Sequence, residues 1–572
     1  MSSPTPPRTC CRAWQTRGSG SPEQPRHIDN PEVPVPKIHR SNVRTGVATS
    51  VAAATVLAVG CSTGITGGTS SDSRTLTLAE SAEYTTLNPL EYPLGMTGKM
   101  YDGLVQVSEN GHLAASLASE MPIPNADLTT WTVPLRAGVT FSDGSVFDAE
   151  DVVAAYTAVR DPDYGSPLAA DYEMVRSVSA PDPSTVVFEL SYPYAGLPAR
   201  LTLGIPATEA IGRSVTDSPL VTTPVGTGPY RVAKWRRGAS MTLAARDDWW
   251  GGSPTVTTIH LVFVPDENSR AQRVRSGEVD GAQLSPLVAA ALDGSAPGLH
   301  AVTNPSADFR AISLPSTLPF FTDPSVRVAL NLGTDRKAMI DGILRGHGVA
   351  VSTPFTPAQG AAYEPTAAFA YDPDAAAALL DKAGWVVGQD GIRSKDGIEF
   401  GFELMYFAND GLRRDVAQAF ASDMSKLGVT VRLEGVDRPH AVAGMRNKAF
   451  VLGGGDMPYD PDAQAYRVLH SSFAAYDRND AYSNPSMFAD AEVDRLLDTA
   501  RREPDTQIRD ALYRRLQERL LSNPPMVTVL ALKHTYIAWD LDRWDGLLSV
   551  VEPHEHGVAW GPWWNVQVWT VR

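Results

Sequence analysis

An uncharged apolar segment that ends in a cysteine divides this chain of 572 residues into a short leader and one large folding unit. Two cations, Arg40 and Arg44, precede the apolar run at 45–60, and Cys61 follows it. Positive charge, a short apolar stretch and small residues before a cleavage point are typical of a secretory signal. The run is too short to span the roughly 30 Å hydrocarbon core of a bilayer as a stable helix. Residues 43–60 are therefore predicted to be a signal peptide that is removed.

The end of this segment, Leu-Ala-Val-Gly-Cys, resembles a bacterial lipobox, in which the cysteine is lipid-modified and becomes the mature N-terminus. It departs from the usual pattern at Ala58, where a leucine is preferred. The alternative is a free cysteine buried behind a soluble apolar segment. We predict lipidation at Cys61, followed by a Gly/Ser/Thr-rich tether over 61–73.

The first 42 residues are rich in Pro, Ser and Arg and have no periodic apolar pattern, so they cannot build a core. We expect a polar leader here. One explanation is an over-extended gene model with translation starting near Val43; the other is a functional cytoplasmic leader.

Charge and cysteine usage exclude several classes of function. The 60 residues before Cys61 hold seven of the 49 Lys and Arg and three of the 65 Asp and Glu, which leaves 42 basic and 62 acidic residues and a net charge near −20. Such acidity argues against nucleic acid as a partner and against electrostatic docking on anionic lipid. No cysteine follows Cys61, which excludes a cysteine hydrolase, a thiolate metal site and a redox centre. The remaining 510 or so residues are too many for one core and predict two or three lobes.

Short strands alternate with amphipathic helices along the rest of the chain. Val, Ile, Phe and Leu runs bounded by turn residues predict strands at 185–190, 258–264, 400–407, 429–436 and 526–532. Apolar residues at helical spacing predict helices at 148–156, 412–427 and 505–521. Asp148 is the expected N-cap of the first of them. The pattern predicts a mixed α/β protein.

Eight segments, in order, resemble the extracytoplasmic solute-binding proteins of peptide and nickel ABC transporters, solute-binding family 5. They lie at 86–89 with 101–104 (TLNP, YDGL), 131–156 (WTVPLRAGVTFSDGSVFDAEDVVAAY), 224–238 (PVGTGPYRVAKWRRG), 246–254, 276–282, 320–344, 371–385 and 488–503. The resemblance covers nearly all of the chain from about Arg74. It implies a periplasmic-binding-protein-like α/β fold of class II, with three lobes, a hinge and a ligand cleft between lobes.

The resemblance also implies the extent of each lobe. Lobe I is expected at 74–112, 223–308 and 531–572, lobe II at 113–222, and lobe III at 309–530. Lobes I and III close on the ligand by a hinge motion, and peptide ligands lie extended like an added strand. We interpret Gly226, Gly228 and Pro229 as a bend between lobes that needs unhindered φ. Gly144 is expected in a tight turn.

In peptide-binding members of the family, an aspartate after a short Gly- or Trp-rich strand pairs with the ligand's α-ammonium. The matching stretch here is 450–456, which makes Asp456 the first candidate and Asp460 the second, with Tyr459 lining the pocket. The family's tryptophan is missing and the spacing is one residue longer. The alternative for Asp456 is an exposed loop carboxylate.

A second polar cluster contains Glu552, His554, Glu555 and His556. Two histidines with flanking carboxylates could hold a transition metal, but the spacing fits no standard zinc pattern, and an exposed loop is the favoured interpretation. The chain has no HExxH helix, GxSxG elbow or phosphate loop. We therefore expect a protein that is not an enzyme and needs neither metal nor cofactor.

These observations predict a lipid-anchored receptor on the outer face of the cytoplasmic membrane. It would be a monomer that captures short peptides or other small solutes and delivers them to an ABC permease and its ATPase. The alternative is a lipoprotein of the same fold that regulates or scaffolds the cell envelope without transport.

Overall fold

The computed structural model describes residues 74–572 except 93–94, 110, 456, 478–480 and 555–556. These described residues belong to one compact unit. The predicted leader, signal peptide and tether, with Cys61, lie outside the described residues, as does Asp456. In the described part of the chain, no helix combines the length and apolar character needed to cross a membrane.

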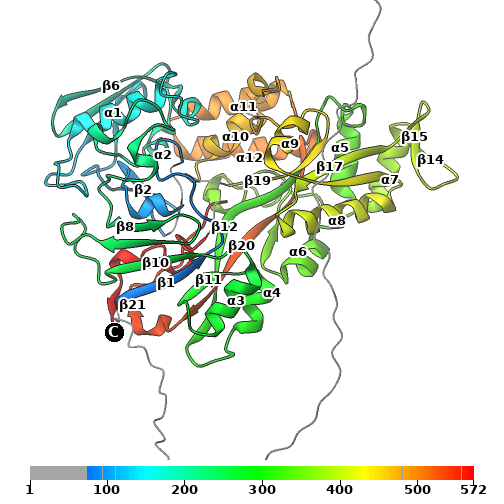
Figure 1. The fold of residues 1–572 in the computed structure, drawn as a ribbon. Coiled ribbons are helices and arrows are strands. Elements are labelled where there is room, and N and C mark those ends of the chain that lie inside the picture. Colours follow the sequence, from blue (N-terminus) through cyan, green and yellow to red (C-terminus); the bar gives the residue numbers. More distant parts are fainter. Residues whose placement is uncertain (1–73, 93–94, 110, 456, 478–480, 555–556) are drawn as a thin grey trace, which may run out of the picture. The chain divides into compact units, whose positions relative to one another are not determined.

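One large sheet organises the described residues (Figure 1). Its strands, in spatial order, are β18 (Thr430–Val436), β17 (Gly401–Phe407), β19 (Ala449–Gly454), β12 (Leu299–Ser313), β20 (Met526–Trp539), β11 (Gly281–Gln283), β1 (Thr75–Glu80), β10 (Thr258–Phe263), β9 (Ser240–Ala245) and β8 (Tyr230–Arg236). A short strand, β13 (Gly348–Ala350), also pairs with β20. The sheet is mixed, since β1 runs parallel to β10 and β11 while β12 and β20 are antiparallel.

The long strands β12 and β20 lie side by side through the middle of the sheet (Figure 1). Their register breaks in the centre: Pro305 lies opposite Lys533, whereas Phe309 lies opposite Ala531. Extra residues on one strand of a pair bend it and increase its twist. The lobe boundaries expected from sequence, 308/309 and 530/531, fall at this irregularity.

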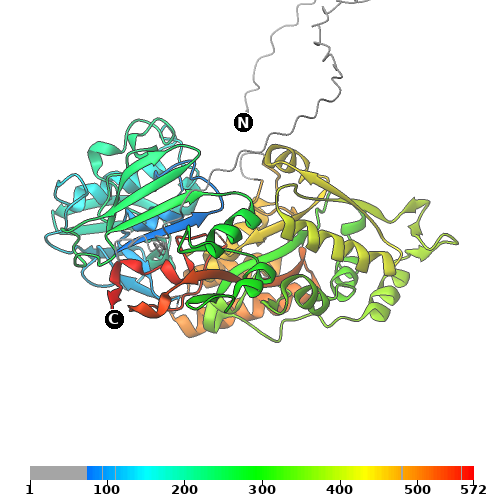
Figure 2. The same ribbon diagram turned by 60° about the horizontal axis from the view of Figure 1, so that its bottom comes forward.

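Three large hydrophobic cores occupy different stretches of the chain. The first contains residues of 76–261 and 536–569 and packs on the β1 half of the sheet. The second lies entirely within 90–215, around a separate four-stranded sheet. The third lies within 312–532, around the β17 half of the large sheet. Figure 2 shows the blue and cyan segments gathered at one end of this unit and the yellow-green segments at the other.

The smaller sheets belong to local hairpins and extensions. The four-stranded sheet consists of β4 (Ile123–Pro124), β5 (Thr130–Pro134), β7 (Thr185–Leu190) and β6 (Val175–Asp182). The others are β2 (Val105–Val107) with β3 (Leu113–Ala115), β14 (Val386–Val387) with β15 (Arg393–Lys395) and β16 (Ile398–Glu399), and β21 (Trp544–Asp545) with β22 (Thr570–Val571).

Most α-helices begin directly after an aspartate whose carboxylate accepts a hydrogen bond from a first-turn backbone N–H. These helices are α1 (Ala149–Arg160), α3 (Glu267–Arg275), α5 (Pro324–Leu332), α6 (Arg336–Leu344), α7 (Pro373–Lys382), α8 (Gly411–Lys426), α9 (Arg438–Gly444), α10 (Pro461–Leu469), α11 (Ala491–Arg502) and α12 (Thr506–Ser522). The remaining two are α2 (Leu197–Arg200) and α4 (Pro286–Leu292). Aspartate is among the best N-caps, because its oxygen satisfies an N–H that has no partner inside the helix. Part of the chain's acidic excess therefore serves helix initiation.

The structure confirms the five strands and the three helices that the sequence predicts. Asp148 caps α1 in a capping box with Asp151, and α1 continues beyond the predicted 156 to Arg160. The strand predicted to end at 532 continues to Trp539, because the residues that follow are still mostly apolar and buried. Gly144 has φ +90° in the expected turn.

The prediction that Gly226 and Gly228 are needed for an unhindered φ is wrong. Neither glycine has a left-handed φ. Instead, a Cβ on Gly226 would lie 2.2 Å from the carbonyl oxygen of Met100, and a Cβ on Gly228 would lie 2.6 Å from the carbonyl carbon of Met100. These glycines are needed for close backbone approach rather than for conformational freedom.

Candidate functional site

A cavity of about 170 Å³ brings together three segments that are far apart in sequence. The three segments are 89–107, Met457 just after β19, and 559–567 near the C-terminus. Ser116, Thr202 and Gly204 line the cavity beside the first segment. Ligand sites in proteins are concave and carry a few convergent polar groups. This cavity meets both conditions and is the candidate ligand site.

Lys99 ends the 3₁₀-helix η1 (Gly95–Lys99) and lines this cavity. Its side chain is buried, with 5% of the residue exposed. The Nζ donates to the carbonyl oxygens of Trp563, at 3.1 Å, and Trp564. Burial lowers the pKa of Lys99 to about 7.

Besides the Tyr101 hydroxyl, three polar atoms of the residues that line the cavity are buried and lack a hydrogen-bond partner among the described residues. They are the Oγ of Ser116, the Nε1 of Trp560 and the Oε1 of Gln567. Buried polar groups are nearly always paired, and leaving one unpaired costs about 1–3 kcal/mol. These atoms have less than 1 Å² of accessible surface, so they lie within the packed wall of the cavity rather than on its inner surface.

Asp102 also lines the cavity, but its carboxylate is held by the protein. Oδ2 accepts hydrogen bonds from Trp250 Nε1 at 2.8 Å and from Thr227 Oγ1 at 3.0 Å. Burial raises the pKa of Asp102, and these hydrogen bonds oppose the rise without cancelling it. Asp102 therefore fixes the backbone beside Lys99 rather than offering a free charge.

The predicted ligand residues near β19 have internal partners where the structure describes them. Asp460 caps α10 and forms a bidentate ion pair with Arg509, with N–O distances of 2.7 and 2.8 Å. A ligand ammonium would have to compete with that guanidinium. Tyr459 is buried, and its hydroxyl donates to the carbonyl of Val551 at 2.7 Å. Of this segment, Met457 reaches the cavity.

Asp462, to which sequence reasoning gave no role, is the centre of a buried polar network. Its carboxylate accepts from Tyr194 Oη at 2.8 Å and from Arg501 Nε and Nη2 at 3.0 and 3.1 Å. Arg501 also reaches Glu173 at 3.3 Å. The network joins the second hydrophobic core to helices α10 and α11. Asp462 follows Asp460-Pro461 at the start of a helix, and nothing in the sequence distinguishes a network centre at this position from an ordinary helix-capping aspartate.

A second network lies beside the register break between β12 and β20. His534 has Nδ1 at 2.8 Å from Glu552 and Nε2 at 3.1 Å from Asp308. Burial lowers the pKa of His534, but the two carboxylates outweigh burial and raise it to about 9. Burial raises the pKa of Asp308, whereas Arg310 and His554 lower it by more, so that it lies well below its ordinary value. This network is a buried set of mutually neutralising charges.

The exposed-loop interpretation of the Glu552 cluster is wrong. Glu552 is completely buried, and its backbone pairs with the irregular part of β12 through Pro305 and Ala307. His554 places Nδ1 at 2.6 Å from Asp308, with 27% of its side chain exposed. Glu555 and His556 lie outside the described residues. Within the described ranges, no group of three or more His, Cys, Asp or Glu side chains is arranged to hold a metal.

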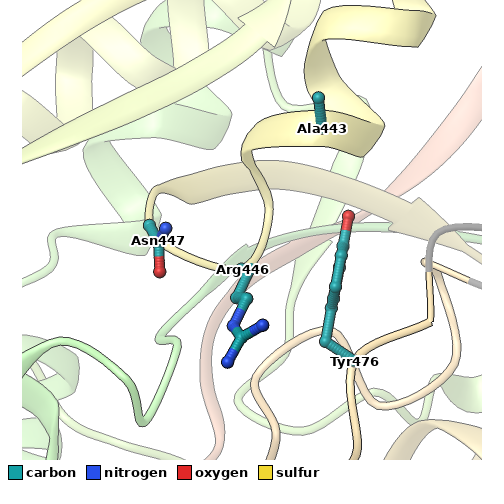
Figure 3. A pocket seen from close by; sticks show the side chains of 4 residues that line it. All are labelled: Ala443, Arg446, Asn447 and Tyr476. Atoms are coloured by element: carbon teal, nitrogen blue, oxygen red, sulfur yellow. The ribbon is translucent and has the colours of Figure 1, made fainter. Parts of the chain in front are cut away.

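A larger cavity, of about 410 Å³, lies at the end of α9 and is lined by Ala443, Arg446, Asn447 and Tyr476 (Figure 3). The Tyr476 hydroxyl points toward α9 and donates to the carbonyl of Val442. Its lining residues come from one stretch of 34 residues. It does not bring distant segments together, so we prefer the smaller cavity as the ligand site.

Comparison with known proteins identifies the chain's relatives. Residues 112–476 match the family described as bacterial extracellular solute-binding proteins, family 5 Middle. This chain belongs to solute-binding family 5. Family 5 members are extracytoplasmic binding proteins and not enzymes.

Individual relatives agree with the family assignment. Protein XP55 of Streptomyces lividans is 36% identical over 488 residues, which cover 85% of this chain and 88% of XP55. Oligopeptide-binding protein AppA of Bacillus subtilis is 24% identical over 445 residues, covering 74% of this chain and 79% of AppA. The crystal structure of NikZ from Campylobacter jejuni in complex with Ni(L-His) matches with a TM-score of 0.78 and 25% identity, covering 87% of this chain and 99% of NikZ. The family 5 fold expected from sequence is confirmed.

Proposed function

We propose that this chain is the lipid-anchored substrate-binding component of an ABC importer. It captures short peptides outside the cell and delivers them to a permease that is driven by an ATPase. The observation that supports capture most strongly is the cavity at Lys99, where three segments that are far apart in sequence meet.

Hinge closure between three lobes is part of this proposal. The lobe boundaries are those expected from sequence, and they agree with three separate hydrophobic cores and with the irregular β12–β20 pairing. The Asp462 network supports a closed arrangement, since Tyr194 of the second hydrophobic core and Arg501 on α11 share one buried carboxylate.

Peptides are the proposed ligands because a family relative, AppA, is an oligopeptide-binding protein. NikZ binds Ni(L-His), which provides a rival class of ligand for the same fold. Both kinds of ligand carry carboxylates and amines, so the fold alone does not separate them.

A thermal-shift screen tests capture and ligand class together. A ligand that binds only the folded state stabilises it by about 2.7 kcal/mol at a hundredfold excess over Kd. Di- to pentapeptides should raise the melting temperature of the purified protein, whereas Ni(L-His) should not. A shift with Ni(L-His) alone would replace peptides by metal complexes as the ligand class. A failure of every solute would favour the scaffolding alternative.

Membrane attachment has its own test. Cys61→Ser should release the protein from the membrane fraction or leave it unprocessed, because the acyl chains would have no acceptor. A processed Cys61→Ser protein that stayed on the membrane would rule out lipidation at this residue.

A further inference from the structure

Lobe II is joined to the rest of the chain only through lobe I. With the boundaries expected from sequence, the chain enters lobe II at 112/113 and leaves it at 222/223, and both crossings lead to lobe I. Lobe III is likewise joined to lobe I, at 308/309 and 530/531. A hinge motion of lobe III relative to lobe I must therefore break the contacts of lobe II on one side, either those with lobe I or those with lobe III.

The contact between lobe II and lobe I is apolar and continuous. Leu90, Leu104 and Val105 of lobe I belong to the same hydrophobic core as the side chains of lobe II, and Trp250 packs against that core. A backbone hydrogen bond also crosses the boundary, from the Val105 N–H to the carbonyl of Leu201 at 3.0 Å. Separation would expose buried apolar surface to water, at a cost that grows with its area. Lobe II is therefore expected to move together with lobe I.

The contact between lobe II and lobe III is polar. None of the hydrophobic clusters formed by the described residues contains side chains of both lobes. Instead, the Tyr194 hydroxyl of lobe II donates to the Asp462 carboxylate of lobe III at 2.8 Å. Arg501 Nη1 lies 3.3 Å from Glu173 Oε1, and the carbonyl of Arg501 accepts a hydrogen bond from the Ala195 N–H at 3.2 Å. Water can replace these hydrogen bonds when the lobes separate, so this contact can open and form again.

The lobe III half of this contact is already assembled within lobe III. Asp462 on α10 is fully buried and pairs with Arg501 on α11 at 3.0 Å, and the Arg501 side chain is only 7% exposed. From lobe II, Arg200 at the end of α2 approaches Asp462 to 3.9 Å, and Asp171 lies 3.4 Å from Arg467 of α10. Helices α2, α10 and α11 meet at this point (Figure 1). Lobe II thus meets a set of charges that is held in place before contact.

We propose that this contact is a latch that forms when the lobes close, with Asp462 and Arg501 on lobe III and Tyr194 and Glu173 on lobe II. The inference rests on the proposed hinge closure and names residues that set ligand affinity without touching the ligand. None of these four residues is among those that line the cavity at Lys99. A contact made only in the closed state favours that state even without ligand. Where the closed state is the minor one, loss of the latch lowers the closed fraction and the apparent affinity by the same factor.

Small-angle X-ray scattering of the purified protein without ligand tests the latch directly. Tyr194→Phe removes one hydroxyl and keeps the ring, and Glu173→Gln removes one charge from a side chain that is 49% exposed. Both variants should have a larger radius of gyration than the wild type. Tyr156→Phe is the matched control, because Tyr156 is buried in the same core and its hydroxyl donates to the carbonyl of Arg200 within lobe II, at 3.4 Å. This control should scatter like the wild type.

Peptide binding gives a second readout. The probe is the di- to pentapeptide that raises the melting temperature of the wild type most. Both latch variants should bind it about tenfold more weakly, as for loss of one hydrogen bond to a charged group. Their urea midpoints should fall no further than that of Tyr156→Phe, whereas a purely structural role would lower the midpoint and leave affinity and scattering unchanged.

The two readouts separate the latch from the capture function. Scattering from Tyr194→Phe and Glu173→Gln that matches the wild type would overturn the latch and leave peptide capture standing. Failure of every peptide to bind the wild type would overturn capture, and scattering of the ligand-free proteins would still decide the latch. If Tyr194→Phe does not fold, the partly exposed position of Glu173 allows Glu173→Gln to decide it alone.

Discussion

His534 offers a quantitative test of the buried charge network. The residue is 5% exposed on β20, and each ring nitrogen faces a carboxylate, Glu552 on one side and Asp308 on the other. Both nitrogens can donate only when the ring carries two protons. The folded structure therefore favours the imidazolium, and this raises the pKa of His534 from 6.5 to about 9.

That shift has a direct consequence for stability. A change from 6.5 to about 9 corresponds to roughly 3 kcal/mol, at about 1.36 kcal/mol per pKa unit. Because the folded-state pKa is the higher one, this stabilisation is complete below pH 6.5 and is lost as the pH rises through 9. His534→Gln should therefore lower the free energy of unfolding by about 3 kcal/mol at pH 6, and by much less at pH 10.

Urea unfolding of the wild type and of His534→Gln at pH 6, 8 and 10 measures this difference. His440→Gln is the matched control, since the His440 side chain is 77% exposed and pairs only at the surface with Asp437. Surface pairs contribute about 0–1 kcal/mol. A gap between wild type and His534→Gln that stays constant from pH 6 to pH 10 would refute the charge-network argument and leave only packing.

Three further changes have defined outcomes. Gly226→Ala should prevent soluble folding, because its Cβ would lie 2.2 Å from a backbone carbonyl oxygen. Gly342→Ala in the middle of α6 should express normally, because its Cβ would have nothing within 4 Å apart from its chain neighbours and the backbone of its own helix; soluble yield distinguishes the two variants. Asp460→Asn leaves Arg509 buried without its counter-charge and should lower stability by about 3–5 kcal/mol, read as a fall in the urea midpoint. Asp456→Asn should weaken peptide binding about 30-fold in calorimetry with little loss of stability, and binding within twofold of wild type would reject its role as the amine anchor.

Local structure and family were predictable from the sequence because their signals are local. The Asp148 cap, the turn at Gly144 and the alternating strands each depend on residues within a few positions of one another. The family motifs are continuous segments as well. The close approach at Gly226 was not predictable, because the atom that it faces belongs to Met100, more than a hundred residues earlier.

The polar centres of the molecule depend on distant contacts, and sequence reasoning missed them. His534 and Asp308 are 226 residues apart, and neither lies in a segment that the sequence predicts to be a strand. The Glu552 cluster is expected in an exposed loop because its spacing fits no standard zinc pattern, although the structure buries Glu552 completely. The sequence does not predict the burial of Lys99, since an isolated lysine is most often exposed. Burial is decided by packing, and the pKa values follow from burial.

The acidity of the chain is compatible with the capture of a peptide, because net charge and direct contacts act at different distances. Net charge governs long-range attraction, which salt screens within about 8 Å at physiological ionic strength. It therefore bears on an extended polyanion such as nucleic acid, which would lie along the surface. A small ligand inside the cavity that Lys99 lines would respond instead to the groups of the cavity wall, where a low local dielectric strengthens each contact. Many acidic residues are also already engaged, as helix caps or with arginines such as Arg509 and Arg501. Contacts inside the cavity, rather than the net charge of the chain, therefore govern the capture of a small ligand.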